Sequence, residues 1–209
     1  MELCFSKEKI DDIIKELGKR NMTGYYAETS DDAKKLVLDL VPEGATFSGG
    51  GSMTVQGMGL YDALREKGCE FIDYMAKRGT PEYKEMYAKA TVCDWFFMST
   101  NAMTEDGMLV NIDGSGNRVA NLIHGPEHVI IVTGINKICP DLDSAVYRAR
   151  NIASPPNCRR LNKKTPCVVT DKCEDCFSPD CICNQFVITR RSRNLGRIFV
   201  IIVNEELGF

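Results

Sequence analysis

Polar side chains follow two apolar stretches in the middle of the chain. Residues 95–99 (WFFMS) and 129–132 (VIIV) have the composition of buried strands, and each runs into polar residues. The carboxyl ends of the strands in an open α/β sheet form the usual ligand-binding edge, so we expect these side chains to converge on one small ligand. The predicted ligand contacts at this edge are Asn101, Thr104, Asn136 and Lys137.

Two carboxylates, Glu105 and Asp106, lie in the turn after the first of these stretches. A desolvated carboxylate can act as a general base or as a nucleophile. We therefore expect Glu105 to be the catalytic residue, and the alternative is an ordinary solvated loop carboxylate. For Lys137 the alternative to an anion contact is a surface lysine. His124 and His128 flank a Gly-Pro pair, so a structural role is favoured over a paired metal site.

A glycine-rich segment, SGGGSMT at residues 48–54, separates an expected strand from an expected helix. Glycines let backbone N–H groups approach an anion closely, and hydroxyl groups can donate to a phosphate or carboxylate. The segment matches neither a Walker loop nor the dinucleotide-binding pattern G-x-G-x-x-G. It predicts anion contacts from Gly50, Gly51, Ser52 and Thr54, and the alternative is a tight turn in which Ser52 caps the helix.

Cysteine is abundant, with ten residues in the chain and five between positions 167 and 183. The N-terminus lacks the pattern of an export signal, so we expect a reducing, cytoplasmic location, where metal or redox use is favoured over disulfides. The C-x2-C pair Cys173 and Cys176, with further thiols nearby, suits a tetrahedral sulfur site. The sequence does not separate zinc from an iron–sulfur cluster, and Cys158 could be a further ligand. The alternative to a metal site is a set of free thiols on a loop.

Strand and helix patterns alternate over the first hundred residues, which predicts an α/β fold with a mainly parallel, three-layer sheet. Residues 108–112 and 119–123, joined by Asp-Gly-Ser-Gly-Asn, predict an added β-hairpin. Residues 151–164 are rich in proline and basic side chains and predict an extended loop. We expect one domain over residues 1–209, with residues 151–185 as a cysteine-rich segment within it.

Composition excludes several classes of protein. With 44% apolar and 26% charged residues, the chain has the composition of a globular protein. Its net charge of -3 provides no field that would attract nucleic acid. The longest apolar run, residues 198–203, is too short to cross a membrane. We expect a small anionic ligand and a homo-oligomer, with neither nucleic acid nor membrane as a partner.

The chain resembles the LUD-domain proteins of the lactate-utilisation family over nearly its whole length. The segments that carry the resemblance are residues 48–54, 100–120, 132–138, 149–161 and 172–184. The resemblance implies the fold of glucosamine-6-phosphate isomerase, ribose-5-phosphate isomerase and CoA-transferases, with the anion against the glycine loop. It also implies a metal set of Cys167, Cys173, Cys176 and Cys183, with Cys181 as the spare thiol. No catalytic role carries over from it.

Three functional hypotheses follow. The first is an enzyme or enzyme subunit in organic-acid metabolism that acts on a small organic acid, phosphate ester or CoA ester at the glycine loop. The second is an iron–sulfur electron-transfer or assembly subunit of a lactate-oxidising complex. The third is a ligand-binding regulatory subunit whose cysteines hold a structural zinc. Fold alone does not choose among them.

Overall fold

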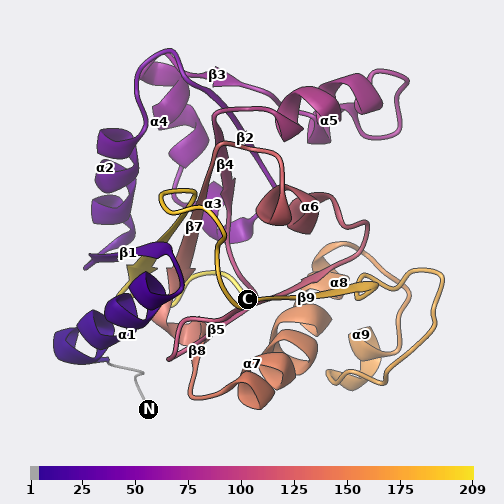
Figure 1. Cartoon of the computed structure of the whole chain (residues 1–209). Helices are drawn as coiled ribbons and strands as arrows, with labels where there is room; N and C mark the ends of the chain where they lie inside the picture. Colours follow the sequence, from indigo (N-terminus) through magenta and orange to yellow (C-terminus); the bar gives the residue numbers. More distant parts are fainter. Residues whose placement is uncertain (1–4) are drawn as a thin grey trace.

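A parallel sheet forms the centre of the molecule (Figure 1). The structure, a computed structural model, describes residues 5–209, and within them the sheet has six strands in the order β1-β10-β7-β4-β2-β3. Every pair of neighbouring strands in it is parallel. This confirms the predicted α/β class. The strands are β1 (Met22–Ala27), β2 (Thr46–Gly49), β3 (Glu70–Phe71), β4 (Trp95–Met98), β7 (His128–Gly134) and β10 (Ile198–Val203).

Helices cover both faces of this sheet, because its strands bury alternate side chains on opposite sides. In β7, Val129 and Ile131 belong to one core cluster, and Ile130 and Val132 to the other. The first cluster is closed by α1 (Lys7–Lys19), α5 (Tyr83–Thr91) and α6 (Asn117–Ile123). The second is closed by α2 (Ser30–Leu40), α3 (Met53–Gly57) and α4 (Leu60–Glu66).

A second, mixed sheet lies beside the first, in the order β8-β5-β6-β9. Its strands are β5 (Ala102–Thr104), β6 (Leu109–Asp113), β8 (Ile138–Cys139) and β9 (Gln185–Thr189). The helical segments next to it are α7 (Leu142–Arg148), a π-helix (Ala149–Ala153), α8 (Ser154–Arg160) and α9 (Cys167–Thr170). β5 and β6 pair antiparallel, so a hairpin does accompany the parallel sheet.

The second arm of the predicted hairpin is wrong, because residues 119–123 are helical. They belong to α6, which begins after Gly116 in a left-handed conformation (φ 81°). Val119 and Leu122, three positions apart, are buried on one side of this helix. β6 pairs instead with β5 and with β9, where Asn111 lies opposite Val187. A short apolar run fits a strand or a buried helix equally well, and here tertiary packing decided the outcome.

The predicted extended loop at residues 151–164 is also wrong in its first half. Residues 149–153 form a π-helix that continues into α8. Pro155 and Pro156 lie at the start of α8, directly after the π-helix. Residues 172–184, which contain most of the clustered cysteines, are irregular as expected.

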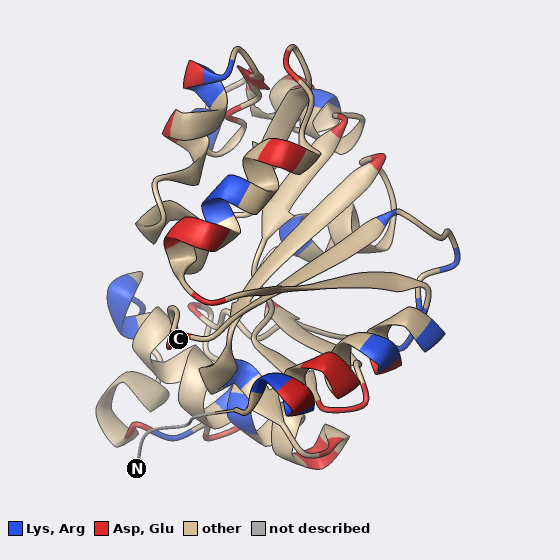
Figure 2. Cartoon of the chain, turned by 90° about the vertical axis from the view of Figure 1, so that its left-hand side faces the viewer, with Lys and Arg blue, Asp and Glu red and all other residues tan. Residues whose placement is uncertain are grey.

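Charged side chains lie mainly on the helices and loops, whereas the strands carry few of them (Figure 2). This agrees with the burial of both faces of the parallel sheet. Within residues 5–209, no helix combines the length and the apolar character needed to cross a membrane.

Candidate functional site

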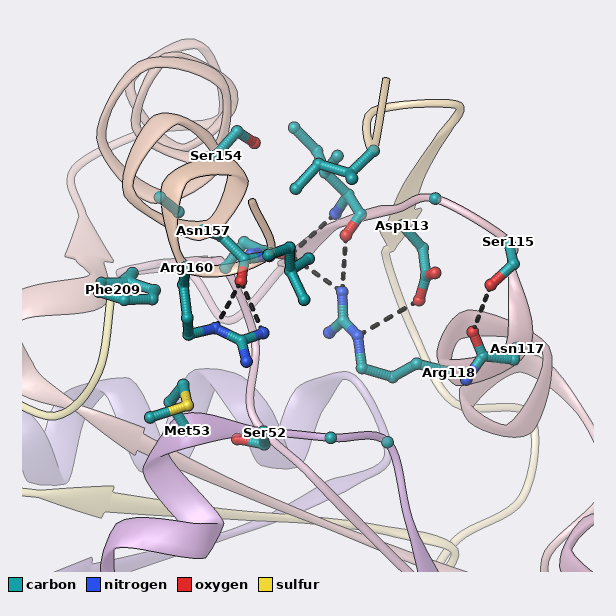
Figure 3. Close-up of a pocket in the computed structure, with 18 of the residues that line it drawn as sticks. Ser52, Met53, Asp113, Ser115, Asn117, Arg118, Ser154, Asn157, Arg160 and Phe209 are labelled. Atoms are coloured by element: carbon teal, nitrogen blue, oxygen red, sulfur yellow. Dashed lines mark hydrogen bonds and ion pairs between the residues drawn. The ribbon is translucent and has the colours of Figure 1, made fainter. Parts of the chain in front are cut away.

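A cavity of about 680 Å³ opens where β2, β4 and β7 end, between the parallel sheet and the second sheet. The glycine loop (residues 50–54), residues 99–101 and Lys137 form the wall that belongs to the parallel sheet. Residues 112–118 and part of α8 form the wall on the other side, and residues 179–182 of the cysteine-rich segment complete it. Figure 3 shows side chains from these segments pointing toward one another across the cavity.

Most of the predicted ligand contacts line this cavity, namely Gly50, Gly51, Ser52, Thr54, Asn101 and Lys137. Two others do not. Thr104 uses its hydroxyl to accept the N–H of Met108 at 2.8 Å. Asn136 accepts the N–H of Leu207 at 3.1 Å, so it holds the C-terminal segment beside the glycine loop.

Glu105, the predicted catalytic residue, lies outside the cavity wall. Its carboxylate forms an ion pair with Lys9 of α1, and its backbone N–H donates to the carbonyl of Cys139 at 2.8 Å. β5 explains this position, because the chain passes along this strand between the cavity wall at Asn101 and the turn that contains Glu105. Glu105 therefore lies one strand away from the cavity wall.

The glycine loop forms the predicted capping turn, and its anion contacts stay a prediction. Ser52 caps α3 by accepting the N–H of Val55 at 3.4 Å, as the turn interpretation requires. The loop also forms a wall of the cavity. Gly50 is needed for packing, because a Cβ atom there would lie 2.7 Å from Cγ of Arg118. Gly51 has a φ of 71°, a conformation that suits glycine.

Lys137 is a buried lysine without a carboxylate partner among the described residues. It ends the short 3-10 helix Ile135–Lys137 that follows β7, its exposed fraction is 3%, and it lines the cavity. Nζ donates to the hydroxyls of Thr54 and Ser99, both at 3.1 Å. Burial, and then the charges of Arg148 and Arg118, lower the pKa of Lys137 from its usual 10.5 to about 7. A substantial share of this amine is therefore neutral at pH 7.

Arg118 joins the ends of β4 and β6. It forms an ion pair with Asp113, in which Nε lies 3.3 Å from the carboxylate. Its remaining N–H groups donate to four oxygens at 2.6–3.0 Å, those of Ser99 O, Asn101 Oδ1, Asn111 Oδ1 and Ile112 O. A guanidinium group has five N–H donors, and all of them are used within the protein. Arg118 thus fixes the cavity wall and adds positive charge, but has no donor left for a ligand.

Further cations stand around the cavity and were not predicted from the sequence. Arg160 bonds to the amide oxygen of Asn157 at 2.8 and 3.0 Å (Figure 3). Lys163 lies 3.7 Å from Asp180. In the part of the chain that the structure describes, Arg78, Lys137 and Arg160 line the cavity without an ion-pair partner. The surplus of positive charge favours an anion.

Six cysteines line a second, smaller cavity of about 50 Å³: Cys158, Cys167, Cys173, Cys176, Cys181 and Cys183. The four predicted metal ligands are therefore near one another. Burial raises the pKa of Cys158 to about 11 and that of Cys183 to about 12, so both are protonated thiols at neutral pH. No three His, Cys, Asp or Glu side chains within residues 5–209 are placed to hold one metal ion. The thiols share one cavity without meeting at one metal position, and the metal assignment stays a prediction.

The two cavities share a wall. Ser154, Cys181 and Ile182 line both of them. Ser154 donates from its hydroxyl to the carbonyl of Ala149 at 2.8 Å, which ties this wall to the π-helix.

Comparisons with known proteins agree with this architecture. The family model described as the LUD domain matches residues 10–203. Among solved structures, a DUF162 family protein from Deinococcus radiodurans has a similar fold, with a TM-score of 0.54 at 9% sequence identity. The match covers 95% of this chain and 97% of that one. No curated protein matches the sequence.

Proposed function

This chain belongs to the LUD-domain family, and on that premise we propose that it binds a small organic acid or phosphate ester in the cavity beside the glycine loop, as a lactate-utilisation-type enzyme or enzyme subunit. The observation that carries the proposal is a set of basic side chains without ion-pair partners that faces one cavity, two of them arginines and one the partly neutral Lys137. Arg78, Lys137 and Arg160 come from segments far apart in the sequence. Among the described residues, none of them has a carboxylate within ion-pair distance.

The charge balance of the wall supports an anionic ligand. The carboxylates of Asp113 and Asp180 are each paired with a cation, Arg118 and Lys163. A ligand carboxylate or phosphate would supply the missing negative charge. Charge-assisted hydrogen bonds to such a group contribute about 1.5–3 kcal/mol each, more than neutral ones.

Different groups along the cavity favour a ligand with more than one polar group. Arg160 comes from α8 on one wall, whereas Ser52 and Lys137 belong to the opposite wall. An acid group bound near Arg160 would leave the hydroxyls and the amine free to contact the remainder of the molecule. Small molecules with an acid group at one end and a hydroxyl or carbonyl group at the other fit this arrangement, among them hydroxy acids, oxo acids and sugar or triose phosphates.

Isothermal titration calorimetry of the full chain tests the proposal. The probes are L-lactate, pyruvate, glycerol 3-phosphate and inorganic phosphate, with isopropanol as a neutral control. We expect at least one organic anion to bind, and Arg160→Ala to weaken its binding about tenfold or more. Lys84→Ala, which removes an exposed lysine outside the cavity, is the matched control and should bind like the wild type. Equal binding by Arg160→Ala and wild type would refute the proposed site.

A further inference from the structure

Building on the proposed function, we propose that Lys137 is a nucleophile that forms an imine with the carbonyl group of a small anionic substrate. The substrate class is a carbonyl compound that carries a carboxylate or a phosphate. The inference rests on three features of Lys137: its hydrogen bonds, its surroundings and its place in the cavity wall.

The hydrogen bonds of Nζ leave its lone pair free. A neutral amine has two N–H groups and one lone pair, and here the hydroxyls of Thr54 and Ser99 accept the two N–H groups at 3.1 Å. Each hydroxyl has a carbonyl oxygen to receive its own hydrogen at 3.4 Å, that of Leu207 for Thr54 and that of Thr100 for Ser99. Both hydroxyls can therefore act as acceptors toward the amine. The lone pair is the remaining position on the nitrogen, and Lys137 lines the cavity.

The surroundings of Lys137 keep the amine from being held as a cation. The charges that lower its pKa, after burial, are those of Arg148 and Arg118, which are positive. Both arginines are held in place by hydrogen bonds to the protein. Arg148 donates to the carbonyls of Asn136 at 2.8 Å and Asn101 at 2.6 Å, while Arg118 uses all its donors in the cavity wall. A lysine beside fixed cations in a desolvated site is an activated nucleophile.

The reaction balances without an added oxidant or reductant. The lone pair of Nζ forms a bond to the carbonyl carbon, and the carbonyl oxygen takes up a proton as the nitrogen loses one. The resulting carbinolamine loses its hydroxyl group as water, and the C=N bond forms. The hydroxyls of Thr54 and Ser99 contact Nζ and can carry the proton between nitrogen and oxygen. The imine then withdraws electrons from the neighbouring carbon and weakens its bonds.

The test is reductive trapping on the wild-type full chain with sodium cyanoborohydride. Pyruvate and glyoxylate probe the carboxylate arm, and dihydroxyacetone phosphate probes the phosphate arm. L-Lactate, which lacks a ketone or aldehyde group, and acetone, which lacks an anionic group, are the controls. Peptide mass mapping should find the reduced adduct at Lys137 well before any other lysine, with a carbonyl anion and with neither control. The arm that reacts identifies the acid group of the substrate.

Calorimetry on the same preparation separates this inference from the proposed function. A carbonyl anion that binds in an Arg160-dependent manner but leaves no adduct at Lys137 would overturn the imine and leave the anion site intact. Adducts spread evenly over exposed lysines would overturn it as well. Absence of binding by all the anions would overturn both.

Discussion

Replacement of Lys137 by methionine should stabilise the fold, and by an amount that depends on pH. In the folded protein the pKa of this lysine is about 7, against 10.5 for an ordinary lysine. Between these two values the unfolded chain binds more protons than the folded one, so stability rises with pH across this window. The cost of the buried amine is therefore largest at and below pH 7, and it disappears above pH 10.5.

The magnitude follows from the shift in pKa. At pH 7 the desolvated amine costs the fold about 4 kcal/mol, and at pH 9 about 2 kcal/mol. Methionine has a similar length and no charge, and it leaves the hydroxyls of Thr54 and Ser99 without their nitrogen partner, which offsets part of the gain. We expect Lys137→Met to be more stable than wild type at pH 7, and its advantage to shrink by about 2 kcal/mol at pH 9.

Urea unfolding followed by circular dichroism at both pH values measures this difference directly. Lys163→Met is the matched control, because Lys163 lines the same cavity but is partly exposed beside Asp180. Its effect on stability should be small and nearly the same at both pH values. A Lys137→Met variant that is less stable than wild type, by the same amount at pH 7 and pH 9, would refute the argument from burial.

Three more experiments test other parts of the structure. Arg118→Ala should lower the free energy of unfolding by about 3–5 kcal/mol in urea titrations, because it leaves a buried carboxylate and several oxygens unpaired. A loss below about 1 kcal/mol would contradict the role of Arg118 in the cavity wall. Glu105→Gln removes a half-exposed ion pair outside the cavity, so calorimetry should find anion binding unchanged, and lost binding would return Glu105 to the site. The predicted metal set of Cys167, Cys173, Cys176 and Cys183 implies that elemental analysis of anaerobically prepared protein should find zinc or iron. The metal should be lost in Cys176→Ser and kept in Cys181→Ser. Wild-type protein without metal would refute the assignment.

The elements that the sequence predicts well are those whose signals are local. Residues 198–203 form a continuous run of apolar and β-branched side chains, and β10 has these same bounds. Pro42 directly follows the cap of α2, where a proline ends a helix. The composition of the glycine loop predicts a close approach to its backbone, and in the structure the side chain of Arg118 packs against Gly50.

The remaining features depend on contacts between distant segments. A lysine after a strand has the same sequence context whether or not a carboxylate lies nearby. Only the fold shows that, within residues 5–209, Lys137 has no ion-pair partner. The role of Arg118 could not be predicted either, because it lies between the expected turn and an expected strand. Its partners come from positions 99 to 113. The distance of Glu105 from the cavity wall also required the fold, because the sequence does not show that β5 separates it from the end of β4.

The wall shared by the two cavities links two kinds of chemistry. Cys181 and Ile182 contact the anion cavity on one side and the thiol cavity on the other. An oxidant or soft metal ion that draws the thiols together would move this wall and change the affinity for the anion. By thermodynamic reciprocity, a bound anion would shift the thiols' affinity for that metal by the same factor. The occupancy of the anion cavity and the state of the thiols then form one coupled equilibrium.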